Sequence, residues 1–92
     1  MDLRSQLPAL CGGVTYLDAA ATTPTPQPVI DAVADAMARG GSPGRGLHRL
    51  GFAATQALAS AREAIAASLG GAAGELVFVR SATEGLTLVA AG

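Results

Sequence analysis

The sequence predicts an α/β fold in which helices flank an incomplete, mostly parallel sheet. Residues 75–80 are rich in β-branched and aromatic side chains, which is typical of a buried strand. A helical pattern precedes this strand and another follows it, and the loops between them suit an α/β layer arrangement. Only two or three strands are visible, and so small a parallel sheet leaves its edges unpaired. We therefore expect the missing strands to come from more polypeptide or from another subunit.

The chain is expected to begin with an N-terminal arm, residues 1–13, ahead of one domain segment, residues 14–92. The arm is predicted to contain a helical turn whose length Pro8 limits. Residues 14–17 have the composition of a strand, and a loop of small residues begins at Asp18. We expect the carboxylate of Asp18 to organise this loop by accepting backbone N–H groups.

Two helices are predicted before the central strand. The first covers residues 28–38, because Pro28 suits a first helical turn and apolar residues recur at three- and four-residue spacing. The second covers residues 50–69, and glycine pairs at 40–41 and 70–71 end the two helices. The apolar stripe of the second helix comprises Leu50, Ala54, Ala57, Leu58, Ala61, Ile65 and Leu69.

A small polar turn after the central strand is predicted to open a third helix. Ser81 and Glu84 have the spacing of a capping box, in which the hydroxyl accepts from the third helical N–H and the carboxylate from the N–H of the cap. The free N–H groups of the same helix start, at the positive end of its dipole, can also hold a phosphate. Taken alone, the motif leaves both readings open.

Composition excludes several classes of function. Half of the residues are apolar, but with only three aromatic residues and many alanines the core must be thin. The net charge is -1 and the arginines are scattered, so no nucleic-acid surface is expected. One cysteine and one histidine cannot assemble a zinc site, and no metal site is predicted. Without a membrane-span pattern or a signal peptide, we expect a cytoplasmic protein.

The sequence contains no lysine, because all six cationic residues are arginines. Covalent chemistry between an amine and a carbonyl cofactor requires a lysine side chain. These residues alone therefore supply no covalent anchor for such a cofactor.

Four motifs in order carry a resemblance to a known family. Tyr16-Leu-Asp-Ala-Ala-Ala-Thr-Thr-Pro24 is similar to the opening motif of cysteine desulfurases and their relatives among the class V aminotransferases. Arg45-Gly-Leu-His48 with Ala54-Thr55 resembles a segment of the SufS-like group, and Ala61-Arg62 with Ile65-Ala66 resembles a helix of that group. Glu75-Leu-Val-Phe-Val-Arg-Ser-Ala-Thr-Glu84 resembles the family's strand-turn-helix motif.

The resemblance implies a fold-type-I enzyme that uses pyridoxal 5'-phosphate (PLP) to take sulfur from L-cysteine, leaving alanine and an enzyme persulfide. Members of the family run to several hundred residues. Their PLP lysine, the aspartate under the pyridine nitrogen and the persulfide cysteine lie beyond the matched part. The expectation is therefore an N-terminal fragment or split subunit that has no catalytic residue of its own and is inactive alone.

Specific residues take roles only through this resemblance. Thr83 matches a threonine whose hydroxyl and N–H bind the cofactor phosphate, and Ala82 matches a neighbour that supplies another N–H. These two residues imply a partial PLP site at the phosphate end. Arg45 matches an arginine that lines the active site across a dimer interface, and Ala20 and Ala21 match a loop near the substrate.

Several positions keep two interpretations. His48 suits either a loop or helix-start position or a catalytic role, and Arg45 suits either a solvated loop or substrate contact. Cys11 precedes the motifs and is expected to take no part. Ser81 replaces the usual glycine of the SufS-like pattern, and Ala19 replaces an Asn or Ser that could hydrogen-bond a substrate.

The partner expected from the resemblance is the remainder of the enzyme or a full-length homologue, in a homo- or hetero-oligomer. An alternative is a non-catalytic interaction module that associates with such a homologue. A third interpretation keeps the fold and changes the substrate, because kynureninase-like and epimerase-like members share this opening.

Overall fold

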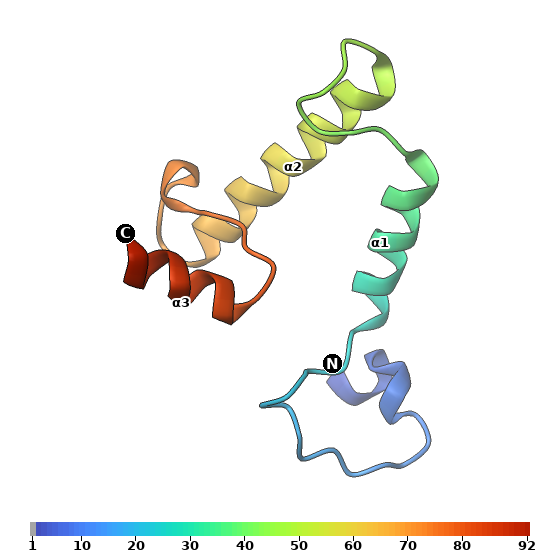
Figure 1. Ribbon diagram of the computed structural model, residues 1–92. Coiled ribbons are helices and arrows are strands. Elements are labelled where there is room, and N and C mark those ends of the chain that lie inside the picture. The colour runs from blue at the N-terminus through green and yellow to red at the C-terminus, as the bar shows by residue number, and fades with distance from the viewer. Residues whose placement is uncertain (1) are drawn as a thin grey trace. The chain divides into compact units, whose positions relative to one another are not determined.

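The computed structural model describes residues 2–92, and its helices are joined by loops (Figure 1). The chain divides into two compact units, Met1–Ala54 and Thr55–Gly92. The helical elements in the described range are, in order, η1 (Leu3–Gln6), η2 (Pro8–Leu10), α1 (Gln27–Arg39), α2 (Arg49–Ser68), η3 (Ala73–Glu75) and α3 (Ala82–Ala91), where η marks a 3-10 helix.

The first unit begins with the predicted helical turn, which Pro8 divides into η1 and η2. The side chain of Asp2 caps η1 by accepting from the N–H of Arg4 at 3.0 Å. The side chain of Arg4 in turn donates to the carbonyl of Val14, which ties this arm to the chain that follows. The separation of residues 1–13 as a distinct part stays a prediction.

Helix α1 confirms the helix predicted over residues 28–38. Pro28 lies in its first turn, where the missing N–H of a proline does no harm. Gly40 ends it with φ of 68°, and the amide of Gly40 donates to the carbonyl of Ala36 at 3.2 Å. A positive φ is readily adopted only by glycine, which explains why the helix ends here.

Helix α2 ends where the glycine pair predicts. The amide of Gly70 donates to Ala67 at 3.1 Å, and that of Gly71 donates to Ala66 at 2.9 Å. Gly70 has φ of 77°. This pair of bonds is a Schellman motif, which satisfies carbonyls that the end of a helix leaves free.

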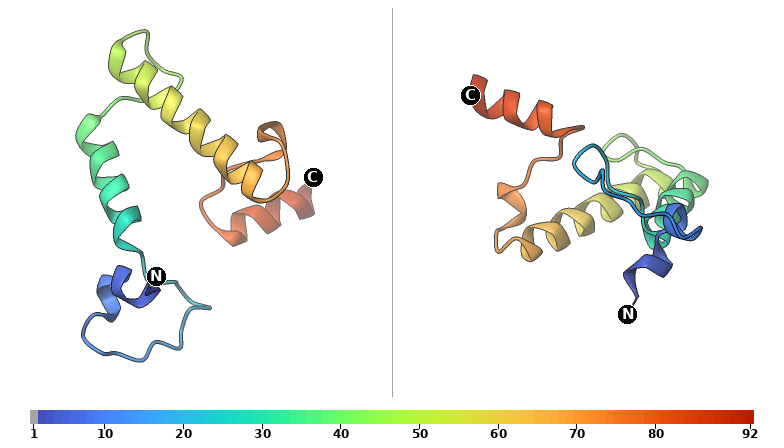
Figure 2. Two further views of the ribbon diagram at one scale, coloured as in Figure 1. Left: turned by 180° about the vertical axis from the view of Figure 1, so that it is seen from behind. Right: turned by 90° about the horizontal axis from the view of Figure 1, so that it is seen from below.

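Residues 2–92 contain no β-strand, so the sheet predicted from residues 14–17 and 75–80 is not confirmed. Leu76 does have extended backbone, with φ of -104° and ψ of 129°. A strand exists only when its backbone groups pair with a second strand, and neither segment has such a partner in this range. The segment from Leu76 to Arg80 instead runs back beside the C-terminal part of α2 (Figure 2).

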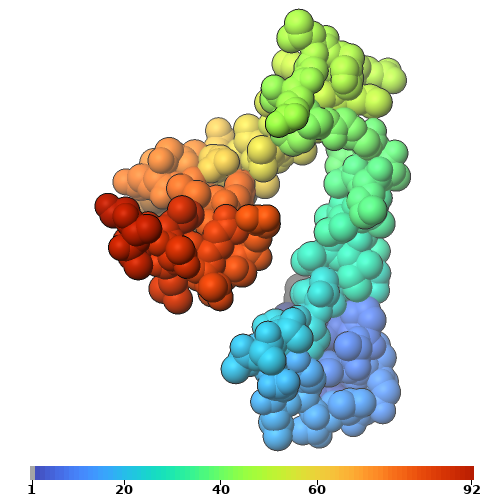
Figure 3. Space-filling model, viewed as in Figure 1, coloured from blue at the N-terminus to red at the C-terminus, as the bar shows by residue number. Residues whose placement is uncertain are grey.

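The core is as thin as the composition predicts. Ala66, 3% exposed, is the buried apolar residue of the described chain. The apolar face of α1 remains open, with Val33 54% and Met37 78% exposed. In the second unit the side chains of α3, drawn in red, form outer surface (Figure 3), and Leu86 is 72% exposed. Burial of apolar area is the main stabilising term in folding, so these faces are suited to being covered by further polypeptide.

Candidate functional site

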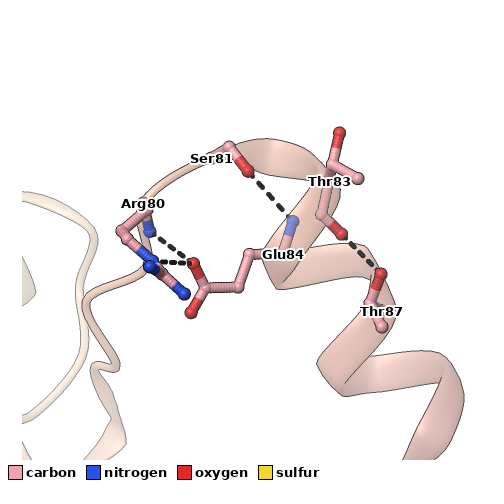
Figure 4. Close-up of polar contacts among 5 residues, drawn as sticks. All are labelled: Arg80, Ser81, Thr83, Glu84 and Thr87. Atoms are coloured by element: carbon pink, nitrogen blue, oxygen red, sulfur yellow. Dashed lines mark hydrogen bonds and ion pairs between the residues drawn. The ribbon is translucent and has the colours of Figure 1, made fainter.

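The start of α3 has the geometry of a capped helix N-terminus. Ser81 is the cap residue, and its hydroxyl accepts from the N–H of Glu84 at 3.1 Å (Figure 4). The carbonyl of Ser81 accepts from the N–H of Gly85 at 3.1 Å. The backbone of Ser81 is extended, with φ of -161°, so a serine is accommodated here without strain.

The second half of the expected capping box forms differently from the prediction. The carboxylate of Glu84 reaches past the cap to Arg80, accepting from its backbone N–H at 3.0 Å and from its side-chain Nε at 3.1 Å (Figure 4). Arg80 offers both a backbone donor and a cation, and charge-assisted hydrogen bonds are stronger than neutral ones. The resulting ion pair places a positive side chain beside the helix start and offsets the charge of Glu84.

Two first-turn amides remain without a partner in residues 2–92, those of Ala82 and Thr83. Both residues are exposed. The carbonyl of Thr83 accepts from the hydroxyl of Thr87 at 2.8 Å, whereas the hydroxyl of Thr83 points away from this bond and has no partner in the described chain (Figure 4). These donors, at the positive end of the helix dipole, have the chemistry to bind an anion such as a phosphate group.

The loop predicted near the substrate is a closed turn in the first unit. The carbonyl of Asp18 accepts from the amide of Ala21 at 3.0 Å and from that of Thr22 at 3.3 Å. This corrects the prediction that the Asp18 carboxylate organises the loop, because the main chain does so. Ala20 lies inside the turn, and both alanines are exposed. Their methyl groups leave the backbone open to approach.

Arg45 lies in the loop between α1 and α2. Its backbone amide donates to the carbonyl of Ser42 at 3.4 Å, which forms a turn. Its side chain is exposed and has no ion-pair partner within residues 2–92. Arg45, Ala20 and Ala21 all belong to the first unit, whereas Ala82 and Thr83 belong to the second.

His48 directly precedes helix α2. Its ring Nδ1 accepts from the N–H of Gly51 at 3.2 Å, and its carbonyl accepts from the N–H of Phe52 at 3.0 Å. Those two bonds define an N-cap residue. A Cβ built on Gly46 would lie 2.6 Å from the ring Nε2, so the loop backbone at Gly46 packs directly against the imidazole. Of the two interpretations left open by the sequence, this geometry supports the helix start.

Cys11 is exposed, and its thiol lies 3.7 Å from the carbonyl of Leu7. It lines a shallow surface hollow with Asp2, Arg4, Ser5, Leu10 and Gly13. No cluster of three or more metal-ligating side chains occurs in the described range. No helix in that range is both long and apolar enough to cross a membrane.

Sequence reasoning missed two structural residues near these sites. The hydroxyl of Tyr16 lies 2.5 Å from the carbonyl of Thr22 and 3.2 Å from that of Asp18, which closes the small-residue turn. Arg62 contacts Leu76 and Phe78, far along the sequence. Both residues belong to the motifs that resemble the family. Those motifs marked the two positions but did not indicate a role for either residue.

The comparisons with known proteins establish the family. The sequence model of the family described as Aminotransferase class-V matches residues 15–92. The chain therefore belongs to the class V aminotransferase family.

Within that family the chain is similar to proteins named as cysteine desulfurases. A probable cysteine desulfurase of Methanothermobacter thermautotrophicus is 39% identical over 99% of this chain and 23% of that protein. The cysteine desulfurase of Serratia proteamaculans is 41% identical over 96% of the chain and 23% of its own length. A probable cysteine desulfurase of Halobacterium salinarum is 46% identical over 84% of the chain and 19% of its own length. The chain thus spans less than a quarter of these relatives, and no solved structure matches it.

Proposed function

We propose that this chain supplies part of the phosphate-binding site of a PLP-dependent cysteine desulfurase-like enzyme. The observation that carries the proposal is the pair of exposed amides at Ala82 and Thr83, which have no hydrogen-bond partner among the described residues. The next two amides of the helix, those of Glu84 and Gly85, already donate to Ser81. Membership of the class V aminotransferase family and similarity to cysteine desulfurases add the cofactor and the substrate class.

In this proposal the residues at the start of α3 bind and orient the phosphate. The amides of Ala82 and Thr83 donate to its oxygens, and the Thr83 hydroxyl adds a third donor. Arg80 offsets the charge of Glu84, which would otherwise repel an anion. When bound, PLP supplies the electron-withdrawing ring that such enzymes need to activate an amino acid.

The substrate side of the proposal rests on the first unit. Arg45 offers an exposed guanidinium without an ion-pair partner among the described residues, which suits recognition of a carboxylate. Ala20 and Ala21 offer a turn with small side chains, where a substrate can approach the backbone closely. Cysteine carries a carboxylate, so the exposed guanidinium of Arg45 is consistent with an amino-acid substrate.

The absence of lysine limits what the 92 residues do by themselves. We propose that they bind the cofactor reversibly, and that the covalent anchor and the remaining catalytic groups belong to another part of the same enzyme or to a partner subunit. Isolated, the chain is then inactive.

Amide NMR tests the phosphate site directly. Titration of the 92-residue chain with PLP, and separately with inorganic phosphate, is expected to shift the amide signals of Ala82 and Thr83. Ala82→Pro removes one donor at the first helical position, where proline is well tolerated after an extended residue. We expect it to weaken phosphate binding about tenfold or more, because each hydrogen bond to a charged group contributes about 1.5–3 kcal/mol.

The matched control is Val89→Ala, which shortens an exposed side chain on the same helix away from the proposed site and is expected to leave phosphate binding unchanged. Shifts in the wild type that are spread over the chain, or equal affinity for Ala82→Pro, would refute the phosphate site. Cofactor absorbance that survives dialysis, or sulfide release from L-cysteine by this chain alone, would refute the claim that it is inactive by itself.

A second candidate function is association with a full-length homologue. The specific observation that favours it is the open apolar face of α1, where Val33 and Met37 are more than half exposed. Co-purification with a full-length cysteine desulfurase tests this association. A chain that is folded, monomeric and does not bind the homologue contradicts it. A kynureninase-like or epimerase-like activity is the alternative to cysteine desulfurase-like activity. Titration of the assembled enzyme with the substrate of each class distinguishes the three activities.

A further inference from the structure

We propose that Arg62 is a positioning residue that fixes the segment leading into the phosphate-binding turn. This inference rests on the proposed phosphate site at Ala82 and Thr83. It adds that a residue of helix α2 holds that site in position. All of the residues involved belong to the second unit.

Arg62 makes two contacts with the segment that follows η3. Its Nη1 donates to the carbonyl of Leu76 at 2.6 Å, and its guanidinium carbon lies 4.7 Å from the centroid of the Phe78 ring. It has no ion-pair partner within residues 2–92. Its charge is therefore committed to holding this segment against α2 rather than to a carboxylate.

The far end of the same segment contacts α3. A Cγ atom of Val79 lies 3.6 Å from the position that a Cβ on Gly85 would occupy, so the Val79 side chain packs beside α3 at this glycine. Arg80 then bonds Glu84 through both its amide and its side chain. Two views show the segment running from beside α2 to the start of α3 (Figure 2). A displacement at Arg62 would thus be passed to the first turn of α3.

An arginine is suited to this position because its planar guanidinium can donate to a carbonyl and stack on an aromatic ring at the same time. The segment it holds has no strand partner in the described range, so few other contacts fix it. The arginine of the Ala61-Arg62 motif thereby has a physical role in holding this segment.

The test uses the 92-residue chain with Arg62→Met, which keeps a long apolar side chain and loses the donor and the charge. Phe78→Leu is the matched variant, since it removes the ring and keeps the carbonyl contact. In the wild type, the Arg62 δ-proton signals are expected to be shifted by the Phe78 ring, and Phe78→Leu should abolish this shift. PLP binding, read at the amides of Ala82 and Thr83, should weaken about tenfold in Arg62→Met and less in Phe78→Leu.

A positioning role also requires that the helix itself survive. Amide exchange at Glu84 reports the Ser81 cap, and we expect it to be unchanged in Arg62→Met while PLP binding falls. Equal loss of both would mean general unfolding and would overturn the positioning role, as would unchanged PLP binding. If the amide signals of Ala82 and Thr83 in the wild-type chain do not change when PLP is added, the proposed function is overturned instead. This holds whether or not the Phe78 ring shifts the Arg62 δ-proton signals.

Discussion

The N-cap formed by His48 gives the sharpest prediction about stability. Replacing His48 by alanine removes the acceptor of the Gly51 N–H, a bond of 3.2 Å to a residue that is itself buried. Loss of an N-cap hydrogen bond costs about 0.5–2 kcal/mol. A cost of 1–2 kcal/mol corresponds to a factor of about 5 to 30 in the local opening equilibrium.

Amide hydrogen exchange at Gly51 and Phe52 measures that equilibrium. We expect protection at these two amides to fall about 5- to 30-fold in His48→Ala. His48→Asn is the control, because asparagine is among the preferred N-cap residues and restores an acceptor. Protection in His48→Asn should stay near the wild-type value.

Equal loss of protection in both variants would refute the N-cap role of His48, since the imidazole would then act through something other than its acceptor. Unchanged protection in His48→Ala would refute it as well. In that case the packing of Gly46 against the ring, rather than the bond to Gly51, would hold the start of α2.

Two further predictions concern the helix ends. Ser81→Ala removes the acceptor of the Glu84 N–H and should destabilise the first turn of α3 by about 1 kcal/mol, visible as faster exchange at the Glu84 amide. Ser81→Asp should retain protection, and unchanged exchange in Ser81→Ala would contradict the cap. Gly41→Ala should be more destabilising than Gly40→Ala, although both residues have positive φ. A Cβ at Gly41 would collide with the carbonyl of Leu50, whereas no atom of the described residues lies within 4 Å of a Cβ at Gly40. Far-ultraviolet circular dichroism during thermal unfolding compares them, and equal midpoints would count against this close approach.

The helices could be predicted from the sequence because their signals are local. Pro28 at the first turn and the glycines at 40 and 70 act through the backbone of their own neighbours, and the structure places the ends of α1 and α2 accordingly. The strand at residues 75–80 could not be settled in this way. Its composition is that of a strand, but a strand also needs a partner whose position no local pattern specifies.

The candidate site shows the same division. Ser81 was predicted as a cap from its spacing to Glu84, and its hydroxyl does accept the expected bond. The carboxylate of Glu84 had two competing donors nearby, and only the three-dimensional arrangement shows that Arg80 is the one it bonds. The contact of Arg62 with Leu76 joins residues 14 positions apart, beyond the reach of periodicity arguments.

The apolar run at residues 77–79 has a consequence for solubility. Its backbone groups have no hydrogen-bond partner within residues 2–92, and Val77 is 71% exposed. Short β-prone runs with open backbone are common starting points for aggregation, and charged residues at their ends slow it. Glu75 and Arg80 flank this run. A parallel, in-register stack of identical copies would place like charges beside each other at both ends, which disfavours that one arrangement.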